Sequence, residues 1–369
     1  MGCCCSTTNS CGVVLDNISS FHRVKTLDID GVARYIRSAG CKRIVVMVGA
    51  GVSVSAGIPD FRSIQNGLYE NKIKAYSTLP SPQHMFDIEY FAENQKPFYS
   101  FVGELLPKPT TLPTKTHHLL KLLSEKGLLS RVYTQNIDML ERIVGIPSQK
   151  IIECHGTMAT ASCAKCKRRV DAERILKKIL DDKTTPKCAH CGGPVKPDIT
   201  FFGEKLPRSL LEQMKLDMPD LRKADLLLVL GTSLAVQPFA SFIDKVGRAV
   251  PRVFVNREGA GKKGDYDDDG GVHMYGRFGN FRDIVLKGDA DKISDALAER
   301  IDWKEELHNS VRNFKTSPSR LVWAGAAGVG EKSSMEHRRS SATSVTFAGG
   351  GGSSRRMSLN GGAAAIHIK

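Results

Sequence analysis

Short apolar runs separated by polar clusters predict a parallel β-sheet. The runs consist mainly of Val, Ile and Leu, and the clearest are residues 44–48, 129–133, 226–230 and 253–255. Continuous apolar runs of this length are typical of strands that are buried on both faces. Helical patterns lie between them at residues 117–126 and 239–248. The sequence therefore predicts an α/β fold, with a Rossmann-like parallel sheet and helices on both faces.

Each of these apolar runs is followed by small or polar residues. The clusters are Gly49-Ala-Gly51, Thr134-Gln-Asn-Ile-Asp138, Gly231-Thr-Ser233 and Asn256. In a parallel α/β sheet, ligands bind outside the carboxyl ends of the strands. Four polar clusters at those ends predict one shared ligand crevice.

The two ends of the chain differ in composition from its middle. Residues 1–30 lack apolar periodicity, and residues 306–369 are rich in Ser, Gly, Lys and Arg. Such segments cannot bury enough apolar surface to offset the entropy lost on ordering. We expect an N-terminal extension over 1–30, one large folded region, and a disordered basic tail over 306–369. A smaller domain attached to the large one stays open.

The formal net charge of +14 raises the question of nucleic-acid binding. Residues 310–369 hold nine Lys and Arg residues and only two acids, so half of the excess positive charge belongs to the tail. A basic tail favours solubility and weak contact with polyanions over sequence-specific DNA recognition.

The sequence has no run of eighteen apolar residues and no pattern of a secretory signal. We therefore expect the protein to be located in the reducing cytoplasm.

Four cysteines have the spacing of a zinc site. Cys163 and Cys166 form one C-x-x-C pair, and Cys188 and Cys191 form a second pair after twenty-one residues. Four thiolates at this spacing bind tetrahedral zinc, which then has no open position for a catalytic water. We expect one structural zinc ion, and redox-active or free thiols are the alternative. The surrounding stretch is rich in Lys, Arg, Gly and Pro and shows no strand pattern.

The glycine loop and one histidine are weaker signals when each is taken alone. Glycines after a strand let main-chain N–H groups approach a pyrophosphate, but this loop departs from the usual dinucleotide fingerprint at Val54. A tight strand-to-helix turn without a ligand is the alternative. His155 follows the apolar pair Ile151-Ile152, near the predicted crevice, and a single histidine is more often structural than catalytic.

Longer motifs carry a resemblance to a known family. Residues 49–62, Gly-Ala-Gly-Val-Ser-Val-Ser-Ala-Gly-Ile-Pro-Asp-Phe-Arg, resemble the signature of the sirtuin (Sir2) family of NAD-dependent protein deacylases. Further motifs follow in the family's order, at Thr134–Asp138, Glu153–Thr157, Lys196–Glu204, Gly231–Val236 and Asn256–Glu258. The resemblance is closest to the eukaryotic cytosolic and nuclear branch. It implies a catalytic domain over 31–305, with a helical insertion over roughly 65–115 and a zinc module over roughly 158–196.

The resemblance implies an enzyme that removes acyl groups from protein lysines. Such an enzyme transfers the acyl group to the ADP-ribose part of NAD and releases nicotinamide and 2'-O-acetyl-ADP-ribose. His155 would act as the base, and Asn136 and Asp138 would orient the leaving carboxamide and stabilise charge. A protein mono-ADP-ribosyltransferase that uses the same NAD site is the alternative, and a non-enzymatic NAD sensor is a third interpretation.

The resemblance also implies the remaining site residues, motif by motif. The residues expected to bind NAD are Gly49, Ala50, Gly51, Ser53, Gly57, Ile58, Pro59, Asp60, Phe61, Arg62, Gln135, Asn136, Ile137, Asp138, Gly231, Thr232, Ser233, Asn256, Arg257, Glu258 and Ala290. The residues expected to bind an acyl-lysine peptide as an added strand are Thr200, Phe201, Phe202, Gly203, Glu204, Leu234 and Val236. Family members often carry Val at the position of Thr200. Relatives that remove acidic acyl groups carry Tyr and Arg at the positions of Gly67 and Glu70, so neutral acyl groups are expected here, with acetyl first.

The resemblance and the N-terminus together suggest partners and a location. Acyl-lysine proteins such as histones or tubulin are the expected substrates. The start Met1-Gly2-Cys3-Cys4-Cys5-Ser6 fits an N-myristoylation signal with adjacent palmitoylation candidates, and two lipids together give stable membrane attachment. A cysteine-rich start without lipid is the alternative. We expect a cytoplasmic protein, with membrane association and a nuclear location left open.

Overall fold

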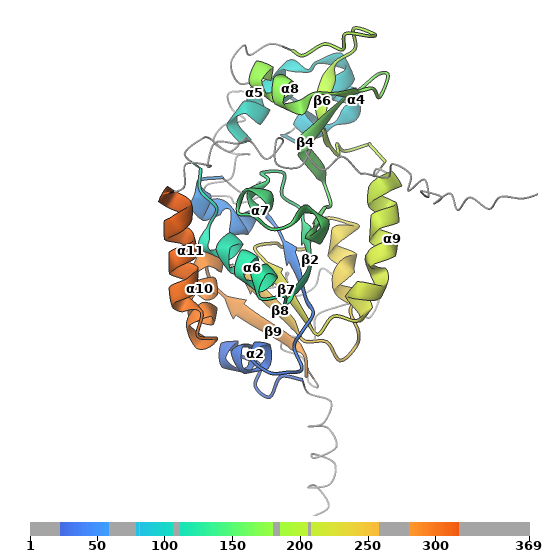
Figure 1. The fold of residues 1–369 in the computed structure, drawn as a ribbon. Coiled ribbons are helices and arrows are strands. Elements are labelled where there is room, and N and C mark those ends of the chain that lie inside the picture. The colour runs from blue at the N-terminus through green and yellow to red at the C-terminus, as the bar shows by residue number, and fades with distance from the viewer. Residues whose placement is uncertain are drawn as a thin grey trace, which may run out of the picture. The chain divides into compact units, whose positions relative to one another are not determined.

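Six parallel strands form the central sheet, in the spatial order β3-β2-β1-β7-β8-β9 (Figure 1). The strands are β1 (Ile44–Val48), β2 (Leu129–Thr134), β3 (Ile151–Glu153), β7 (Leu226–Leu230), β8 (Arg252–Asn256) and β9 (Asp283–Lys287). The computed structural model describes residues 23–58, 79–80, 82–105, 111–179, 185–205, 208–257 and 280–316, all of which belong to one compact unit, residues 1–330. The predicted α/β fold with a parallel sheet is confirmed.

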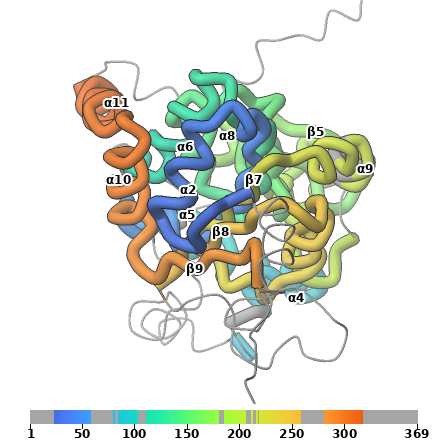
Figure 2. Tube along the Cα trace, turned by 90° about the horizontal axis from the view of Figure 1, so that it is seen from below, coloured from blue at the N-terminus to red at the C-terminus, as the bar shows by residue number. Residues whose placement is uncertain are grey.

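Two apolar cores cover the two faces of this sheet. Successive residues of β1 alternate between them, with Ile44, Val46 and Val48 in one core and Val45 and Met47 in the other. The helices on the first face are α2 (Ile29–Ile36), α6 (Lys115–Glu125), α10 (Ala290–Arg300) and α11 (Lys304–Thr316). The second face is covered by α9 (Arg208–Arg222) and the 3-10 helix η7 (Phe239–Asp244). Figure 2 shows α10 and α11 on one side of the strands and α9 on the other, so the prediction of helices on both faces is confirmed.

A second, antiparallel sheet of three strands lies within the same unit. Its strands are β4 (Gly156–Cys163), β5 (Arg169–Val170) and β6 (Val195–Ile199), in the order β5-β4-β6. It shares a core with the 3-10 helix η4 (Pro82–Phe86) and with α4 (Ile88–Glu93), α5 (Lys96–Leu105) and α8 (Ala172–Lys177). Phe91, Phe98 and Phe201 meet edge to face in this core, with ring centroids 4.9 to 5.3 Å apart. The helices η4, α4 and α5 fall in the range of the predicted helical insertion, and α8 falls in that of the predicted zinc module.

The cysteine-rich stretch, which shows no strand pattern in the sequence, contains the short strand β5 and leads directly into β6. Its charged residues conceal the strand pattern, because Lys196 in β6 is only 6% exposed although its side chain is basic. Lys196 Nζ donates to the main-chain carbonyl of Ile199 at 2.7 Å and pairs with Glu204 at 2.9 Å, which makes its burial tolerable. A pattern that counts only apolar side chains cannot detect such a strand.

Two other elements also differ from what the sequence predicted. The strand β9 was not predicted, because it begins with the charged Asp283, whose carboxylate is buried against Arg252 of β8 with Nη2–Oδ2 at 2.6 Å. The helix expected over 239–248 is a 3-10 helix that ends at Asp244. Among the described residues, no helix has the length and apolar character that a bilayer-spanning segment needs.

The folded unit extends beyond both predicted boundaries. Val24 is buried, and Arg23 donates to the main-chain carbonyl of Ala224, so residues 23–30 are part of the fold. At the other end, α11 occupies residues where composition predicted a tail from 306 onward. A single fully buried residue, Leu307, anchors this otherwise polar helix, and composition averaged over sixty residues does not detect it. The residues of the predicted tail beyond 316 lie outside the described structure.

Candidate active site and metal centre

The polar clusters at the carboxyl ends of β1, β2 and β7 are in direct contact. The main-chain N–H of Gly51 donates to the carbonyl of Gly231 at 2.9 Å, and Thr232 Oγ1 donates to Gln135 Oε1 at 2.9 Å. Asn136 Nδ2 donates to the carbonyl of Gly49 at 3.2 Å. The structure therefore brings together three of the four clusters that the sequence predicted to share one site.

Close main-chain packing explains the glycines in these loops. A Cβ atom on Gly51 would lie 2.7 Å from the Cα of Gly231, and one on Gly49 would lie 2.7 Å from the Cβ of Thr232. Gly231 also has a φ of 62°, which a side chain would strain. The N–H of Gly51 donates to Gly231 and joins the two loops, whereas the N–H of Val52 donates to Gly49 within the glycine loop.

Asn136, Ser53 and Asp138 form a buried hydrogen-bonded group beside the glycine loop. Ser53 Oγ donates to Asp138 Oδ2 at 2.6 Å, and Asn136 Nδ2 lies 3.3 Å from Ser53 Oγ. The main-chain N–H of Leu140 donates to the other carboxylate oxygen of Asp138 at 3.0 Å. Burial raises the pKa of Asp138, whereas the hydrogen bonds from Ser53 and Leu140 lower it.

His155 lies directly after β3, and its ring orientation is fixed by the loop after β2. Its Nδ1 is 3.0 Å from the carbonyl oxygen of Gln135. Because a carbonyl oxygen only accepts hydrogen bonds, Nδ1 carries the proton and Nε2 carries the lone pair. Nε2 is buried and has no hydrogen-bond partner in the described structure. Burial lowers the pKa of His155 and the Gln135 hydrogen bond partly offsets this, so the ring is neutral at pH 7 and can accept a proton.

The residues predicted for the adenosine end lie near the start of α10. Arg257 pairs with Asp289, Nη2 to Oδ2 at 2.7 Å, and Asp289 is the N-cap of α10. Ala290 is 8% exposed at the first position of that helix. Ser55 in the glycine loop donates to Asp291 at 2.7 Å, which links this helix to the loop after β1.

The segment predicted to bind the peptide is held by a buried ion pair. Glu204 Oε2 accepts from Lys196 Nζ at 2.9 Å and from the N–H of Phe201 at 2.9 Å. Phe202 is 54% exposed, but its main chain already bonds to Phe86 and Ile88. Among the described residues, no hydrogen bond uses the main chain of Gly203, which leaves that residue available to an added strand.

Thr200 connects this segment to His155. The N–H of Thr200 donates to the main-chain carbonyl of His155 at 2.8 Å. The hydroxyl of Thr200 is buried and has no partner in the described structure. Two buried polar atoms without partners, Thr200 Oγ1 and His155 Nε2, therefore come from segments joined by one hydrogen bond.

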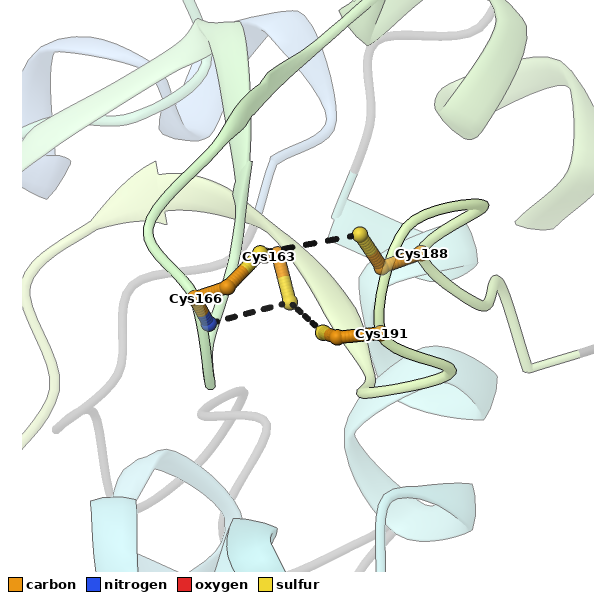
Figure 3. Close-up of side chains that lie close together, drawn as sticks. All are labelled: Cys163, Cys166, Cys188 and Cys191. Carbon is orange, nitrogen blue, oxygen red and sulfur yellow. Dashed lines mark hydrogen bonds between the residues drawn. The ribbon is translucent and has the colours of Figure 1, made fainter.

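The four predicted cysteine ligands lie together at the end of β4 and in the loop before β6 (Figure 3). Cys163 Sγ is 3.5 Å from Cys191 Sγ, and Cys166 Sγ is 3.7 Å from Cys188 Sγ. Disulfide sulfurs are about 2.05 Å apart, whereas sulfurs at about 2.3 Å from a tetrahedral zinc ion are nearly 4 Å apart. The cluster therefore fits one structural zinc ion and not a pair of disulfides.

The electrostatics of the cluster also favour a bound cation. Although burial raises the pKa of Cys163, hydrogen bonds from the N–H of Cys166 and from Cys191 lower it to about 6. Although the N–H of Gly193 lowers the pKa of Cys191, the Cys163 sulfur and burial raise it to about 11. Four thiolates cannot ionise together unless a bound metal neutralises them.

Comparison with known proteins agrees with this geometry. The family model described as "Sir2 family" matches residues 49–238, from the first glycine of the loop to the end of the segment after β7. The chain belongs to the Sir2 family. It is 42% identical over 294 residues to the NAD-dependent protein deacetylase sirtuin-2 of Danio rerio, covering 78% of this chain and 75% of that protein. It is 37% identical over 312 residues to the NAD-dependent protein deacetylase hst2 of Schizosaccharomyces pombe, covering 84% and 88%. Against the NAD-dependent deacetylase sir2A of Dictyostelium discoideum it is 45% identical over 298 residues, which is 79% of this chain but 55% of the longer relative.

Several predicted residues of this Sir2 protein lie outside the described structure. They are Pro59, Asp60, Phe61, Arg62, Gly67, Glu70, Glu258 and the N-terminal lipidation signal. Gly57 and Ile58 are described and end the glycine loop, with Gly57 at a φ of 83°. Ser233 is exposed next to Thr232, and Leu234 is buried with a φ of 56°.

Sequence reasoning missed four residues that support the Sir2 site. Thr134 Oγ1 accepts from the N–H of Asn136 at 3.0 Å and donates to Glu141 at 2.8 Å. Thr114 Oγ1 donates to the carbonyl of Val52 at 3.0 Å and contacts His117 Nδ1 at 2.7 Å. Thr134 and Glu141 lie within or next to a quoted motif, but His117 looked like an ordinary member of a helical pattern.

Proposed function

We propose that this Sir2 protein is an NAD-dependent protein-lysine deacetylase, with neutral acyl groups as its substrates. The observation that carries the proposal is the state of His155. Its Nδ1 proton is fixed on Gln135, and its buried Nε2 has a lone pair and no partner. A base must present such a lone pair at the reacting atoms. The relatives above are named NAD-dependent deacetylases, which supports the same activity here.

The residues at the carboxyl ends of the strands suit NAD as the co-substrate. When bound, NAD supplies an activated ribose carbon from which nicotinamide departs and to which the acyl oxygen adds. Asn136 and Asp138 would orient the carboxamide, because their side chains are held by Ser53 and the main chain. Thr232 and Ser233 would contact the phosphates and ribose, and Asn256 and Arg257 would serve the adenosine end. We include Phe61 and Arg62 in the proposed site on the sequence motif alone.

His155 would take a proton from a ribose hydroxyl of the co-substrate. Its lowered pKa keeps the imidazole neutral at pH 7, so no deprotonation is needed before it acts. The carbonyl of Gln135 would also stabilise the imidazolium that forms, because it already accepts from Nδ1. Partial burial keeps the ring away from bulk water, which strengthens this interaction.

The acyl-lysine peptide would enter as a strand along Gly203 and Leu234. Gly203 offers a main-chain N–H and carbonyl that no described residue uses, and the exposed Phe202 ring offers an apolar surface beside them. Main-chain pairing gives affinity with little demand on peptide sequence. This agrees with a broad class of acyl-lysine proteins as substrates, among which histones and tubulin are candidates.

The deacetylase and the mono-ADP-ribosyltransferase differ in their products. The relatives are named deacetylases and none of those cited is named an ADP-ribosyltransferase, so we retain deacetylation alone. We further propose a catalytic domain that runs from about residue 23 to about residue 316, and a cytoplasmic, lipid-anchored location. A tagged chain whose distribution does not change when Gly2 is replaced by Ala would overturn the lipid anchor.

The function is tested by incubating the full-length protein with an acetyl-lysine peptide and NAD and identifying the products by mass spectrometry. We expect free lysine peptide, nicotinamide and O-acetyl-ADP-ribose in equal amounts. His155→Tyr should lower turnover at least about a thousandfold with the fold intact, because the base is lost. His308→Gln, on α11, is the matched control: it removes only the contact with Asp295 and should keep most of the activity. ADP-ribosylated protein without O-acetyl-ADP-ribose would overturn the proposal, and an active His155→Tyr would remove the assigned base.

A further inference from the structure

Three titratable side chains are buried together next to the proposed nicotinamide end of the site. His117 on α6, Asp138 after β2 and Glu141 in the short helix α7 (Leu140–Ile143) place one nitrogen and two carboxylate oxygens within 4.8 Å of one another. Their exposed fractions are 0%, 5% and 2%. Their role depends on the proposed function, because Asp138 is one of the residues assigned to the carboxamide of NAD.

A continuous series of hydrogen bonds connects the two acids through Asn136. On one side, Asp138 accepts from Ser53, whose oxygen lies 3.3 Å from Asn136 Nδ2. On the other side, the N–H of Asn136 donates to Thr134 Oγ1, which donates to Glu141 Oε1 at 2.8 Å. A shift of either carboxyl group therefore disturbs both the side chain and the main chain of Asn136.

Two buried carboxyl groups this close together need a proton or a cation between them. Among the described residues, no Lys or Arg pairs with Asp138 or Glu141. Arg142, the nearest cation along the chain, pairs with Glu153 at 2.7 Å instead. Burial lowers the pKa of His117 to about 3, so this imidazole is neutral and does not supply the charge. A proton on one carboxyl group remains as the simplest compensation.

The hydrogen bonds and the proximity of the two acids favour Glu141 as the acid that holds that proton. Asp138 accepts from two donors, the Ser53 hydroxyl and the Leu140 N–H, and donors favour the ionised form. Glu141 accepts from one side-chain donor, Thr134, at 2.8 Å, and its own main-chain N–H also lowers its pKa. Burial raises the pKa of both acids, and the Ser53 and Leu140 hydrogen bonds oppose this at Asp138. Burial, followed by the charge of Asp138, raises the pKa of Glu141 to about 8. Glu141 is therefore the protonated member at neutral pH.

Charged groups on the neighbouring elements do not change this assignment. On β3, Glu153 is an anion that raises the pKa of Glu141 further. On α10, Asp291 accepts from Thr116 and favours protonation of His117, but burial of the imidazole outweighs it. On α6, His118 acts in the opposite direction to Asp291. Among the described elements, Arg142 is the only cation next to the cluster, and it already forms an ion pair with Glu153.

We propose that Glu141 is a positioning residue that carries a proton at neutral pH, which keeps Asp138 the single anion of the cluster and holds Asn136 in place. Ionisation of Glu141 adds a second buried anion next to Asp138. The two carboxylates then repel each other, and the hydrogen bonds through Ser53 and Thr134 loosen. Activity and stability should both fall as this proton is lost.

The sign of the pH effect follows from the raised pKa of Glu141. In the unfolded chain Glu141 titrates near its ordinary value of 4.5, and in the folded protein it titrates near 8. The folded state therefore binds the extra proton between these values, and stability falls as pH rises through that window. Above pH 8 the loss is complete. The amide of Glu141→Gln has no proton to lose, so the melting temperature of this variant should exceed that of the wild type by a difference that grows up to pH 8 and then stays constant.

The kinetic test compares Glu141→Gln and Glu141→Ala with the wild type from pH 6 to 10. Gln keeps an acceptor for Thr134 and mimics the protonated acid, so we expect near wild-type kcat at pH 7 and no loss of activity above pH 8 from this group. Ala removes the acceptor, so kcat should fall about ten- to a hundredfold through misplacement of Asn136, with the KM for the acyl-peptide within twofold of wild type. Glu125→Gln, an exposed acid on α6, is the control and should follow the wild-type profile.

The outcomes separate this inference from the proposed function. Identical pH profiles for the wild type and Glu141→Gln would overturn the proposal, and so would a folded Glu141→Gln as inactive as Glu141→Ala. If the wild type lacks deacetylase activity, the pH-dependent difference in melting temperature still tests the proton. Should Glu141→Gln fail to fold, infrared spectroscopy of the wild type tests the proton. A band of a protonated carboxyl group that is present at pH 7 and absent at pH 10 would support the proposal, and its absence at pH 7 would overturn it.

A bound divalent cation is the alternative compensation, and metal analysis tests it. We expect one metal ion per chain, held by the four cysteines. A second equivalent that disappears in Glu141→Gln while the first remains would show that the cluster binds a cation, and would overturn the proton assignment.

Discussion

Two buried polar atoms in the proposed site, His155 Nε2 and Thr200 Oγ1, have no partner among the described residues. Their meaning differs. The lone pair on His155 is required by the chemistry we propose, and its position is fixed by Gln135. The hydroxyl of Thr200 has no such role, because only its N–H is bonded, to the carbonyl of His155. A buried hydroxyl without a partner destabilises the ligand-free fold.

Replacing Thr200 by Val should therefore stabilise the protein. Val has nearly the same shape, keeps the N–H that bonds to His155, and removes the unpaired hydroxyl. We expect the free energy of unfolding in urea to rise by about 1 kcal/mol. Thr157→Val is the matched control and should destabilise, because Thr157 Oγ1 donates to Glu153 at 2.9 Å and accepts from the N–H of Ala159. A loss of stability in Thr200→Val would show that the hydroxyl has a bonded partner in solution.

At the scale of elements, the small antiparallel sheet depends on its metal site. Cys163 ends β4, and Cys188 and Cys191 lie on the loop that leads into β6, so one ion would join both strands. A Cβ atom on Gly193 would lie 3.2 Å from the Cys163 sulfur and 2.8 Å from the side chain of Lys165. The loop can approach the four sulfurs only because this position has no side chain.

Replacing Cys188 by Ala should release the zinc ion and unfold this module. Structural zinc binding is coupled to folding, and its loss costs several kcal/mol. We expect metal content to fall from one equivalent to near zero, with a lower melting temperature. Cys154→Ala is the control, since Cys154 is buried in the core of the large sheet and should lose some stability but no zinc. Full metal content in Cys188→Ala would contradict a four-cysteine site.

The sequence predicts an element well when the residues of that element alone show its burial. The strands β1 and β7 were predicted residue for residue, because both faces are buried and every position is apolar. The cysteine ligands were predicted from spacing alone. By contrast, β6 and β9 contain buried charges, Lys196 and Asp283, whose partners Glu204 and Arg252 lie outside the strand that contains the charge. Burial that depends on a distant partner leaves no local pattern.

The same limit applies to the site. The residues that follow strands could be grouped from sequence, because parallel strands place their carboxyl ends at one edge. His117 could not be assigned to the site from the sequence, because it belongs to a helix and comes close to Glu141 only through the packing of α6 beside α7. Its neighbour His118 has the same residue type but bonds to Ser310 on α11. The sequence alone does not distinguish the two.

At the scale of the whole molecule, α11 supports the helix that backs the proposed site. It contacts α6 through Lys126–Glu306 at 2.5 Å and through His118–Ser310 at 2.8 Å, and Leu307 is completely buried in the main core. At its other end, α6 begins with Thr114, which bonds to the loop after β1. Residues near 310 are thus connected to the glycine loop through one helix.

A chain that ends at residue 303 should therefore be less stable and less active than one that ends at Thr316. Loss of Leu307 burial alone removes about 2 kcal/mol of apolar stabilisation, and α6 would lose the surface against which it packs. We expect a melting temperature several degrees lower, and a raised KM for NAD because the loop held by Thr114 becomes less ordered. Leu307→Ala in the full chain should reproduce most of the loss of stability, since the cavity it leaves is in the same core. If the chain that ends at 303 has the same melting temperature as the chain that ends at 316, α11 does not stabilise the fold, and the burial of Leu307 has no energetic consequence.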